Sequence, residues 1–322
     1  MRANIATLAA GLLSTGVSSL PITASRSSVR ELVELPGVWI ENVGSRSNGN
    51  LLLNTIGDDG QVYSFNPRQS PPNPQVVAQI DGRNALTGIA EVGNDVFAVT
   101  SSIVNLDTLT FQNGSMKVSL LDFKNSGGYG TGKSSVKDVL EGTELGPVNG
   151  ITTLPKHKHI ILGADSVRGE IVRIDTSKGT ANVAFKDDLL APGPSGPFEL
   201  GVNGLKISKG YLYFTNTRRQ SYNRVKIDEY GNKAGEVEVI YKVPSTSTSA
   251  PDDFVLDKHD NAYVTFWPGM LVKITPEGKH DVLVNGTFNG PTSLVWGKGG
   301  HSLYVVTAGR DADGGQVVEV KI

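Results

Sequence analysis

A sheet-forming module that recurs along the chain constrains this sequence most. In residues 146–179, GPVNGITTLPKHKHIILGADSVRGEIVRIDTSKG, we predict three strands. Short apolar runs at residues 150–154 and 160–163 are separated by a polar turn at 156–159, and an alternating run at 170–175 follows a hairpin at 166–169, which is the pattern of antiparallel strands. A fourth strand is expected over residues 180–185. The same order of parts returns from residues 201, 251 and 291, and upstream in residues 40–67 and 86–102. The sequence thus predicts six copies of one four-stranded unit.

Repeats of about 40 to 60 residues with four strands each are typical of sheets arranged radially around a channel. We therefore expect an all-β, six-bladed β-propeller as the single domain of residues 21–322. Residues 29–35, VRELVEL, lie outside the six copies, while the last copy has only three strands. We predict that residues 29–35 complete the last blade beside residues 317–322 and close the ring, because closure hides a sheet edge.

The composition argues against several classes of function. The 322 residues include 30 basic and 32 acidic residues, a net charge of −2, and no cysteine. Without a basic patch, nucleic acid is not an expected partner, and without cysteine there are no disulfides, thiolate nucleophiles or cysteine-bound metals. The motifs of phosphate-binding loops, dinucleotide-binding folds, serine hydrolases and zinc proteases do not occur. The five histidines fall beside outer turns of the modules.

The N-terminus has the layout of a secretory signal. Met1 and Arg2 precede an apolar stretch at residues 5–13 and a small, polar stretch at residues 14–25, and the apolar core is too short to span a membrane. We expect residues 1–20 to be removed on export, which makes the protein secreted or resident in the secretory pathway. A cytosolic protein with an apolar tail is the alternative. The triplets that begin at Asn113 and Asn285 are N-glycosylation acceptor sequences and agree with export.

The first residues of the inner strands are expected to converge on the channel, and four of them carry oxygen ligands: Glu41, Asn149, Asn203 and Asp252. Two carboxylates and two amide oxygens suit a hard cation, so a Ca²⁺ or Mg²⁺ ion on the axis is one expectation. The alternative for the two asparagines is that each Asn-Gly pair only forms the turn into its strand. Glu41 and Asp252 favour a functional role, because charges in a narrow channel need partners.

These four positions resemble the cation ligands of the senescence marker protein and gluconolactonase superfamily of six-bladed propellers. The resemblance implies that Glu41, Asn149, Asn203 and Asp252 hold a divalent cation. The sequence Pro251-Asp252-Asp253 departs from the family's P-D-G turn, so either aspartate could take the ligand role. Glu41 is followed by an asparagine where that family often has Ser-Pro or Gly-Pro.

From about residue 41 to the C-terminus, the chain also resembles a fungal, mostly secreted branch of these propellers. The shared phrases are ENVGSRSNGNLLL, NGITTLP, ADSVRGEIVRIDT, LGVNGL with GYLYFTNT, DDFVLDKHDNAYVTF and GGQVVEV. The resemblance implies a hetero-Diels-Alderase of tropolonic sesquiterpenoid biosynthesis. Such an enzyme orients a quinone methide of the tropolone type and a terpene alkene for a stereoselective (4+2) cycloaddition that yields a meroterpenoid.

This reaction needs an apolar cavity that orients both reactants, and donors that polarise the quinone oxygen, but it requires no cofactor. The predicted donors at the channel mouth are Asn149, Asn203, Asn216 and Arg168. The predicted aromatic walls are Trp39, Tyr129, Phe198, Phe266 and Trp267. Ordinary packing between blades is the alternative for each aromatic residue. Either Asp165 or Glu41 is expected to assist loss of water from a hydroxymethyl precursor as general acid.

Two other functions use the same residues. A divalent-metal-dependent lactonase or esterase of the gluconolactonase type would use the axial cation to polarise a lactone carbonyl, with Asp252 taking the proton. A non-catalytic propeller would only bind a ligand at the channel mouth. In each case the partner is a small molecule, which is apolar for the cycloaddition, and the sequence leaves the oligomeric state open.

Overall fold

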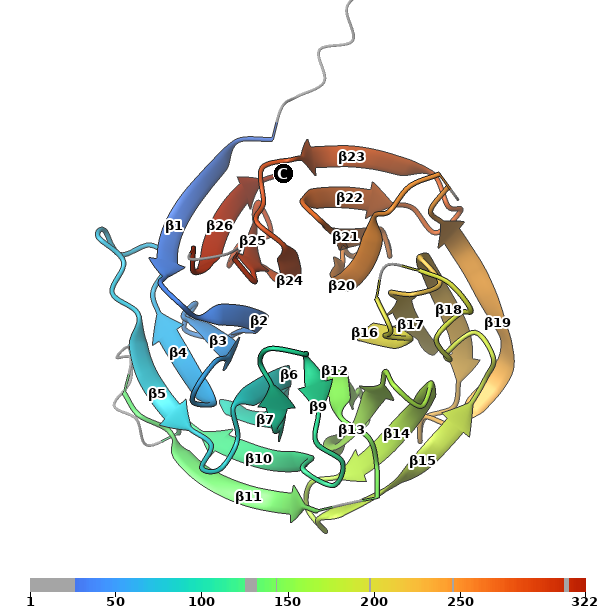
Figure 1. Ribbon diagram of the computed structural model, residues 1–322, viewed down its shortest axis with the longest axis horizontal. Coiled ribbons are helices and arrows are strands. Elements are labelled where there is room, and N and C mark those ends of the chain that lie inside the picture. The colour runs from blue at the N-terminus through green and yellow to red at the C-terminus, as the bar shows by residue number, and fades with distance from the viewer. Residues whose placement is uncertain (1–26, 125–131, 143, 197, 245, 310–312) are drawn as a thin grey trace, which may run out of the picture.

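A computed structural model of the chain describes residues 27–124, 132–142, 144–196, 198–244, 246–309 and 313–322. All regular structure in these ranges is β-strand. The strands form sheets arranged around a central axis, as in a propeller (Figure 1). None of the described segments forms a helix long and apolar enough to cross a membrane. The predicted signal, residues 1–20, lies outside the described residues.

Three sheets each contain four consecutive antiparallel strands. The first contains β12 (Val148–Leu154), β13 (His157–Asp165), β14 (Glu170–Asp175) and β15 (Thr180–Lys186). The second contains β16 (Val202–Ser208), β17 (Tyr211–Asn216), β18 (Ser221–Ile227) and β19 (Lys233–Lys242). The third contains β20 (Ala250–Leu256), β21 (Ala262–Trp267), β22 (Met270–Ile274) and β23 (His280–Asn285).

The upstream strands form one eight-stranded sheet with two halves. One half contains β2 (Trp39–Ser45), β3 (Leu51–Ile56), β4 (Gln61–Phe65) and β5 (Gln75–Gln79). The other half contains β6 (Ala85–Gly93), β7 (Val96–Ser102), β10 (Lys117–Asp122) and β11 (Ser135–Glu141). A single residue pair, Ile56 with Ala85, joins β3 to β6. Between β7 and β10 the chain forms a separate hairpin of β8 (Val104–Asn105) and β9 (Thr110–Phe111).

The last sheet combines both ends of the described chain. It contains β24 (Pro291–Trp296), β25 (Ser302–Thr307), β26 (Gly315–Lys321) and β1 (Val29–Leu35). Strand β1 pairs antiparallel with β26, from Val29 opposite Val320 to Leu35 opposite Gly315. Segment 29–35 therefore lies beside the C-terminal strand.

The hydrophobic core lies between neighbouring sheets, because the second strands are apolar on both faces. In β3, LLLNTI, every residue is buried. Leu162 of β13 and Phe214 of β17 belong to one buried cluster, so these two sheets pack face to face. Burial of one such side chain stabilises the fold by roughly 1.5–3 kcal/mol.

In the module of residues 146–179, the predicted strand bounds can be compared with the observed ones. Its third strand has the predicted bounds, 170–175, but its second strand is longer than the apolar run and extends from His157 to Asp165. His157 already pairs with Leu154 across the turn. The polar residues expected in the turn therefore extend the ladder, because backbone pairing does not require apolar side chains at the exposed end of a strand.

Candidate functional site

A β-bulge near the start of each innermost strand positions the candidate site. The register shifts lie between Ile40 and Asn42, Leu86 and Ile89, Val148 and Ile151, Val202 and Leu205, Pro251 and Phe254, and Pro291 and Ser293. A bulge leaves residues unpaired and re-aims their side chains. The unpaired residues include Glu41, Asn149, Asn203 and Asp252. The bulges thus explain why polar side chains collect at the starts of the inner strands, at one end of the central axis, which we call the mouth.

The glycines that follow Asn149 and Asn203 lie inside strands β12 and β16, so these Asn-Gly pairs do not form turns. A Cβ atom on Gly150 would lie 2.5 Å from the carbonyl oxygen of Asn203, and one on Gly204 would lie 2.5 Å from Oδ1 of Asp253. The recurring glycine is therefore required by the close approach of neighbouring inner strands around the axis.

Two buried carboxylates face the mouth, and each accepts a hydrogen bond from a tryptophan. Trp39 donates its Nε1–H to Oε2 of Glu41 over 2.7 Å, and Trp267 donates its Nε1–H to Oδ2 of Asp252 over 3.1 Å. Asn203 donates its side-chain amide to Oδ1 of Asp252 over 2.8 Å. Glu41 and Asp252 are only 8% and 9% exposed. The mouth therefore holds two carboxyl groups within an aromatic and amide environment.

The burial of these carboxyl groups changes their acidity. Desolvation raises the pKa of Asp252 to about 7, and the charge of Asp253 adds to this effect, while the hydrogen bonds from Trp267 and Asn203 oppose it. Desolvation also raises the pKa of Glu41 well above its usual value, and the charge of Asp252 raises it further. Both shifts favour a protonated carboxyl group in the mouth near neutral pH.

The aromatic walls come from four different segments. The ring centroids of Trp39 and Trp267 lie 6.1 Å apart, and Phe198 meets Trp267 edge-on at 5.6 Å. Phe111 of β9 packs with Trp39 against a small buried cluster. The sequence pattern did not single out Phe111, although the length of the segment between the second and third strands of its module is the signal that points to this hairpin.

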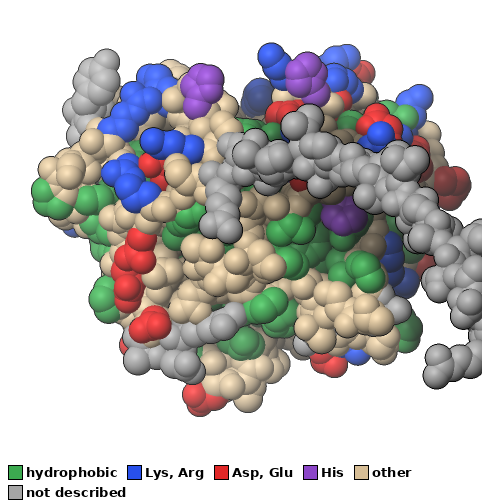
Figure 2. Space-filling model, turned by 90° about the horizontal axis from the view of Figure 1, so that it is seen from above, with side chains coloured by type: hydrophobic (Ala, Val, Ile, Leu, Met, Phe, Trp, Pro, Cys, Tyr) green, Lys and Arg blue, Asp and Glu red, His purple; other side chains and the backbone are tan. Residues whose placement is uncertain are grey.

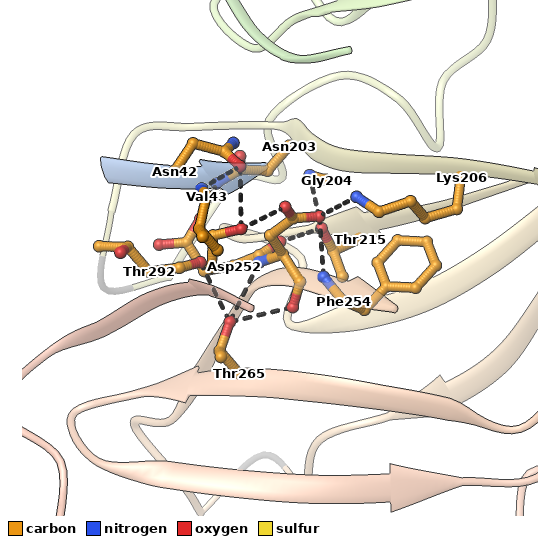
Figure 3. Close-up of polar contacts among 12 residues, drawn as sticks. Asn42, Val43, Asn203, Gly204, Lys206, Thr215, Asp252, Phe254, Thr265 and Thr292 are labelled. Carbon is orange, nitrogen blue, oxygen red and sulfur yellow. Dashed lines mark hydrogen bonds and ion pairs between the residues drawn. The ribbon is translucent and has the colours of Figure 1, made fainter. Parts of the chain in front are cut away.

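A second polar cluster adjoins Asp252 (Figure 3). Oδ1 of Asp253 accepts hydrogen bonds from Nζ of Lys206 and the main-chain N–H of Phe254, both over 2.8 Å. Oδ2 of Asp253 lies 2.7 Å from Oγ of Ser293, which in turn lies 3.0 Å from Oδ1 of Asn42. Asp253 thus forms an ion pair with Lys206, whereas Asp252 accepts its hydrogen bonds from Trp267 and Asn203 in the mouth.

The donor set at the mouth fits a divalent cation. Two neighbouring buried carboxyl groups with raised pKa values form an environment in which a cation would stabilise the ionised state. Asn203 uses both amide protons on Thr217 and Asp252, which leaves its carbonyl oxygen for a ligand. No group of three His, Cys, Asp or Glu side chains suited to a metal occurs among the described residues. Amide oxygens of Asn203 and Asn149 and water would therefore complete the shell.

Two of the predicted site residues instead hold loops. Asp165 and Asn216 end the second strands β13 and β17, and both are fully buried. The carboxylate of Asp165 accepts main-chain N–H groups of Gly146 and Arg168 over 2.8 and 2.9 Å. The amide of Asn216 donates to three main-chain carbonyls between residues 189 and 191. Both side chains therefore stabilise turns in the described structure.

The other predicted residues lie in varied surroundings. Phe266 is 2% exposed and packs edge-on against Tyr241, so it belongs to the core of its sheet rather than to the wall of the mouth. Arg168 is exposed and donates to the main-chain carbonyl of Glu144. Tyr129 lies outside the described residues. The acceptor residues Asn113 and Asn285 are both exposed.

The histidines lie away from the mouth. Four of them lie at or beside turns between inner and second strands, at the far end of these strands: His157, His159, His259 and His301. In Figure 2, histidine side chains lie near lysine and arginine at one end of the molecule, and another histidine lies lower on the visible face. The chemistry of the mouth therefore depends on carboxyl, amide and indole groups.

The chain is similar to several known proteins. Residues 199–309 match the family model described as the SMP-30/Gluconolactonase/LRE-like region. A protein of Phoma sp, provisionally named a hetero-Diels-Alderase, is 24% identical over 81% of this chain and 80% of its own length. The similarly named asR5 of Sarocladium schorii is 26% identical over 84% of this chain and 75% of its own.

Solved structures show the same fold. The calcium-binding protein regucalcin from Agrobacterium tumefaciens superposes with a TM-score of 0.66 at 16% identity, covering 92% of this chain and 95% of its own. A luciferin-regenerating enzyme superposes with a TM-score of 0.65 at 14% identity and the same coverage. The predicted resemblance is thereby confirmed: the chain is similar to the SMP-30/gluconolactonase-like propellers and, over most of its length, to proteins named hetero-Diels-Alderases.

Proposed function

We propose that this protein is a hetero-Diels-Alderase-like enzyme of secondary metabolism whose active site is the mouth at Glu41 and Asp252. One observation carries the proposal: Trp39 and Trp267 each combine an aromatic face with an indole N–H bond to a buried carboxyl group. The same two residues can therefore stack on an apolar reactant and fix an acid beside it. The names of the two relatives support this chemistry.

The acid pair supplies a balanced route to the reactive diene. In a hydroxymethyl tropolone, the protonated member of the pair gives its proton to the leaving hydroxyl group, which departs as water. The ionised member accepts the proton of the ring hydroxyl, so a quinone methide forms and the pair regains its original proton count. The following cycloaddition forms one C–O and one C–C bond without proton transfer. The walls then contribute by holding both reactants together, which converts a bimolecular step into a unimolecular one.

A ring of six blades would hold these groups in place. We propose that the eight-stranded sheet acts as two blades, because one residue pair alone joins its halves. The pairing of β1 with β26 would then close the ring. We also propose export through the secretory pathway with glycans on the exposed Asn113 and Asn285. A mobility shift after endoglycosidase treatment of protein from a fungal host, absent in Asn113→Gln/Asn285→Gln, tests the glycans.

The decisive assay supplies a tropolone-type quinone methide precursor and a cyclic sesquiterpene. We expect one stereoisomer of the adduct in excess, whereas the spontaneous reaction gives a mixture. Glu41→Gln/Asp252→Asn should slow formation of the adduct from the hydroxymethyl precursor, because neither residue can then transfer a proton. Tyr230→Phe, at an exposed far-end turn, is the matched control. An unchanged product ratio with and without protein would refute the proposal.

The carboxyl pair also favours a second candidate, a metal-dependent lactonase. Glu41 and Asp252, with amide oxygens of Asn203 and Asn149, would hold a Ca²⁺ or Mg²⁺ ion, which would supply Lewis acidity toward a lactone carbonyl. Hydrolysis of a simple lactone that stops in EDTA, together with no stereocontrol over the adduct, would favour this candidate.

A further inference from the structure

A small hollow lies in the mouth away from the acid pair. It sits between the inner strands β6 and β12, whereas Glu41 and Asp252 lie on β2 and β20 (Figure 1). Its polar lining comes from Thr87, Asn149 and Ser166, and the hydroxyl group of Thr87 already donates to the carbonyl of Val148. Its apolar lining comes from Phe111, Pro147, Val148, Val167 and Leu200. Its volume is about 10 Å³, which is about the space that one water-sized group needs. The hollow therefore accepts a single atom with its hydrogens, not a ring.

Ser166 has a hydroxyl group that the fold does not use. The residue is 2% exposed, and among the described residues its Oγ has no hydrogen-bond partner. A buried hydroxyl group without a partner costs about 1–3 kcal/mol, and a ligand oxygen that reached Ser166 in the hollow would offset that cost. The serine sits in the tight turn after β13, where the adjacent Asp165 caps the turn. The hydroxyl group itself contributes nothing to that turn.

Asn149 completes the polar part of the hollow. Its side chain lies in the bulge of β12 and is partly exposed. An amide offers two donors and an acceptor, and a hydroxyl group offers one donor and an acceptor. Together they suit an oxygen atom that accepts hydrogen bonds.

The charges around the hollow favour a neutral ligand oxygen over an anionic one. None of the residues that line it carries a charge, while two carboxyl groups stand elsewhere in the same mouth. A carboxylate or phosphate ligand would find no cation in the lining, and it would be repelled by Glu41 or Asp252 when these are ionised. A ketone, aldehyde or hydroxyl oxygen meets neither obstacle.

We propose that the hollow is a subsite for one neutral carbonyl or hydroxyl oxygen of an otherwise apolar ligand, held by Ser166 and Asn149. The assignment to the oxygenated reactant of the cycloaddition rests on the proposed function. In that reaction, the hollow anchors the tropolone-type reactant at an oxygen remote from the acid pair. The hydrocarbon reactant then occupies the aromatic part of the mouth at Trp39, Trp267 and Phe198.

The test separates binding from reaction. Calorimetry with the full chain measures the Kd of tropolone and of the hydrocarbon caryophyllene, and thermal unfolding measures stability. Ser166→Ala should weaken tropolone binding about fivefold, the effect of one neutral hydrogen bond, and leave caryophyllene binding unchanged. Its Tm should stay the same or rise, because an unpartnered hydroxyl group is removed. Ser101→Ala is the matched control, since Ser101 is equally buried and unpartnered but lies outside the lining.

The outcomes for the subsite and for the proposed function are distinct. An unchanged tropolone Kd in both Ser166→Ala and Asn149→Ala would overturn the subsite, even if stereoselective cycloaddition is observed. Equal weakening of tropolone and caryophyllene by Ser166→Ala would also overturn it, because the effect would then be structural. Selective weakening of tropolone binding would support the subsite, even if no cycloaddition is detected and the proposed function fails.

Discussion

Replacing Asp252 by asparagine should change the pH dependence of stability, because it removes a buried ionisable group. Wild-type Asp252 has a pKa of about 7 in the folded protein, against a usual value of 3.8. Between these two values the folded state holds a proton that the unfolded state has lost, so wild-type stability falls as pH rises through this range. Asparagine cannot ionise, so the stability of the variant does not decrease with pH for this reason.

The pKa difference of Asp252 between the folded and unfolded states sets the size of this pH-dependent change in stability. The difference between 3.8 and about 7 corresponds to about 4 kcal/mol at most, since a tenfold change in an equilibrium constant equals about 1.4 kcal/mol. Asparagine also presents an NH₂ group to Trp267 or to Asn203, which now donate to the two carboxylate oxygens. This mismatch costs about 1–3 kcal/mol at every pH. The pH-dependent part of the difference therefore isolates the ionisation.

Urea unfolding of wild type and Asp252→Asn at a series of pH values from 4 to 8, in EDTA, measures this quantity. We expect the free energy of unfolding of the variant to rise relative to that of wild type by several kcal/mol between pH 4 and about 7. Above pH 7 this difference should stay constant. Asp281→Asn, on the exposed outer strand β23, is the matched control and should show no such trend. A stability difference for Asp252→Asn that is constant across the series would refute the reasoning.

Three further predictions concern the ring, the cation and the walls. Deletion of residues 26–36 should expose the edge of β26 and lower the free energy of unfolding by several kcal/mol, and an unchanged Tm would contradict ring closure by β1. Elemental analysis of purified protein should find close to one Ca²⁺ or Mg²⁺ per chain, lost in Glu41→Ala and Asp252→Ala, and a metal-free protein with chelator-insensitive activity would remove the lactonase candidate. Trp267→Phe keeps a ring but loses the donor to Asp252, so the adduct should form more slowly with its stereochemistry retained. Trp267→Ala should degrade both rate and stereochemistry, and stereochemistry that survives this change would show that Trp267 is not a wall.

The repeat pattern was enough to place most strands, because apolar alternation and turn residues act locally. Residues 29–35 and 170–175 form strands with the predicted bounds. Strand ends at the turns were harder to place, as His157 shows, since a ladder continues through polar residues whenever the backbone can pair. The starts of the inner strands can be predicted for the same reason, because each copy of the module opens with a short apolar run, although Asn-Gly occurs at only two of the six starts.

The sequence could not assign the tasks of individual polar residues. The side chains of Asp165 and Asn216 can hydrogen-bond a substrate by their chemistry alone. In the structure they instead bond main-chain groups of loops more than 15 residues away along the chain. The two adjacent aspartates have different partners, since Asp253 forms an ion pair with Lys206 of another strand while Asp252 accepts hydrogen bonds from Trp267 and Asn203, and the sequence does not show these partners. The sequence does not single out Ser166, because the proposed role of its hydroxyl group depends on the absence of a hydrogen-bond partner among the described residues, which only the structure shows.

The hairpin of β8 and β9 contributes a side chain to the mouth but no strand to the described sheets around the axis. The hairpin pairs with none of the sheets around the axis in the described structure, and yet its Phe111 contacts the cluster under Trp39 and lines the hollow beside Asn149. Its length and sequence are therefore free to change without altering any ladder of the ring. Exchange of this one insertion between related chains would transfer a preference for reactant shape while leaving the acid pair, and with it the chemistry, in place.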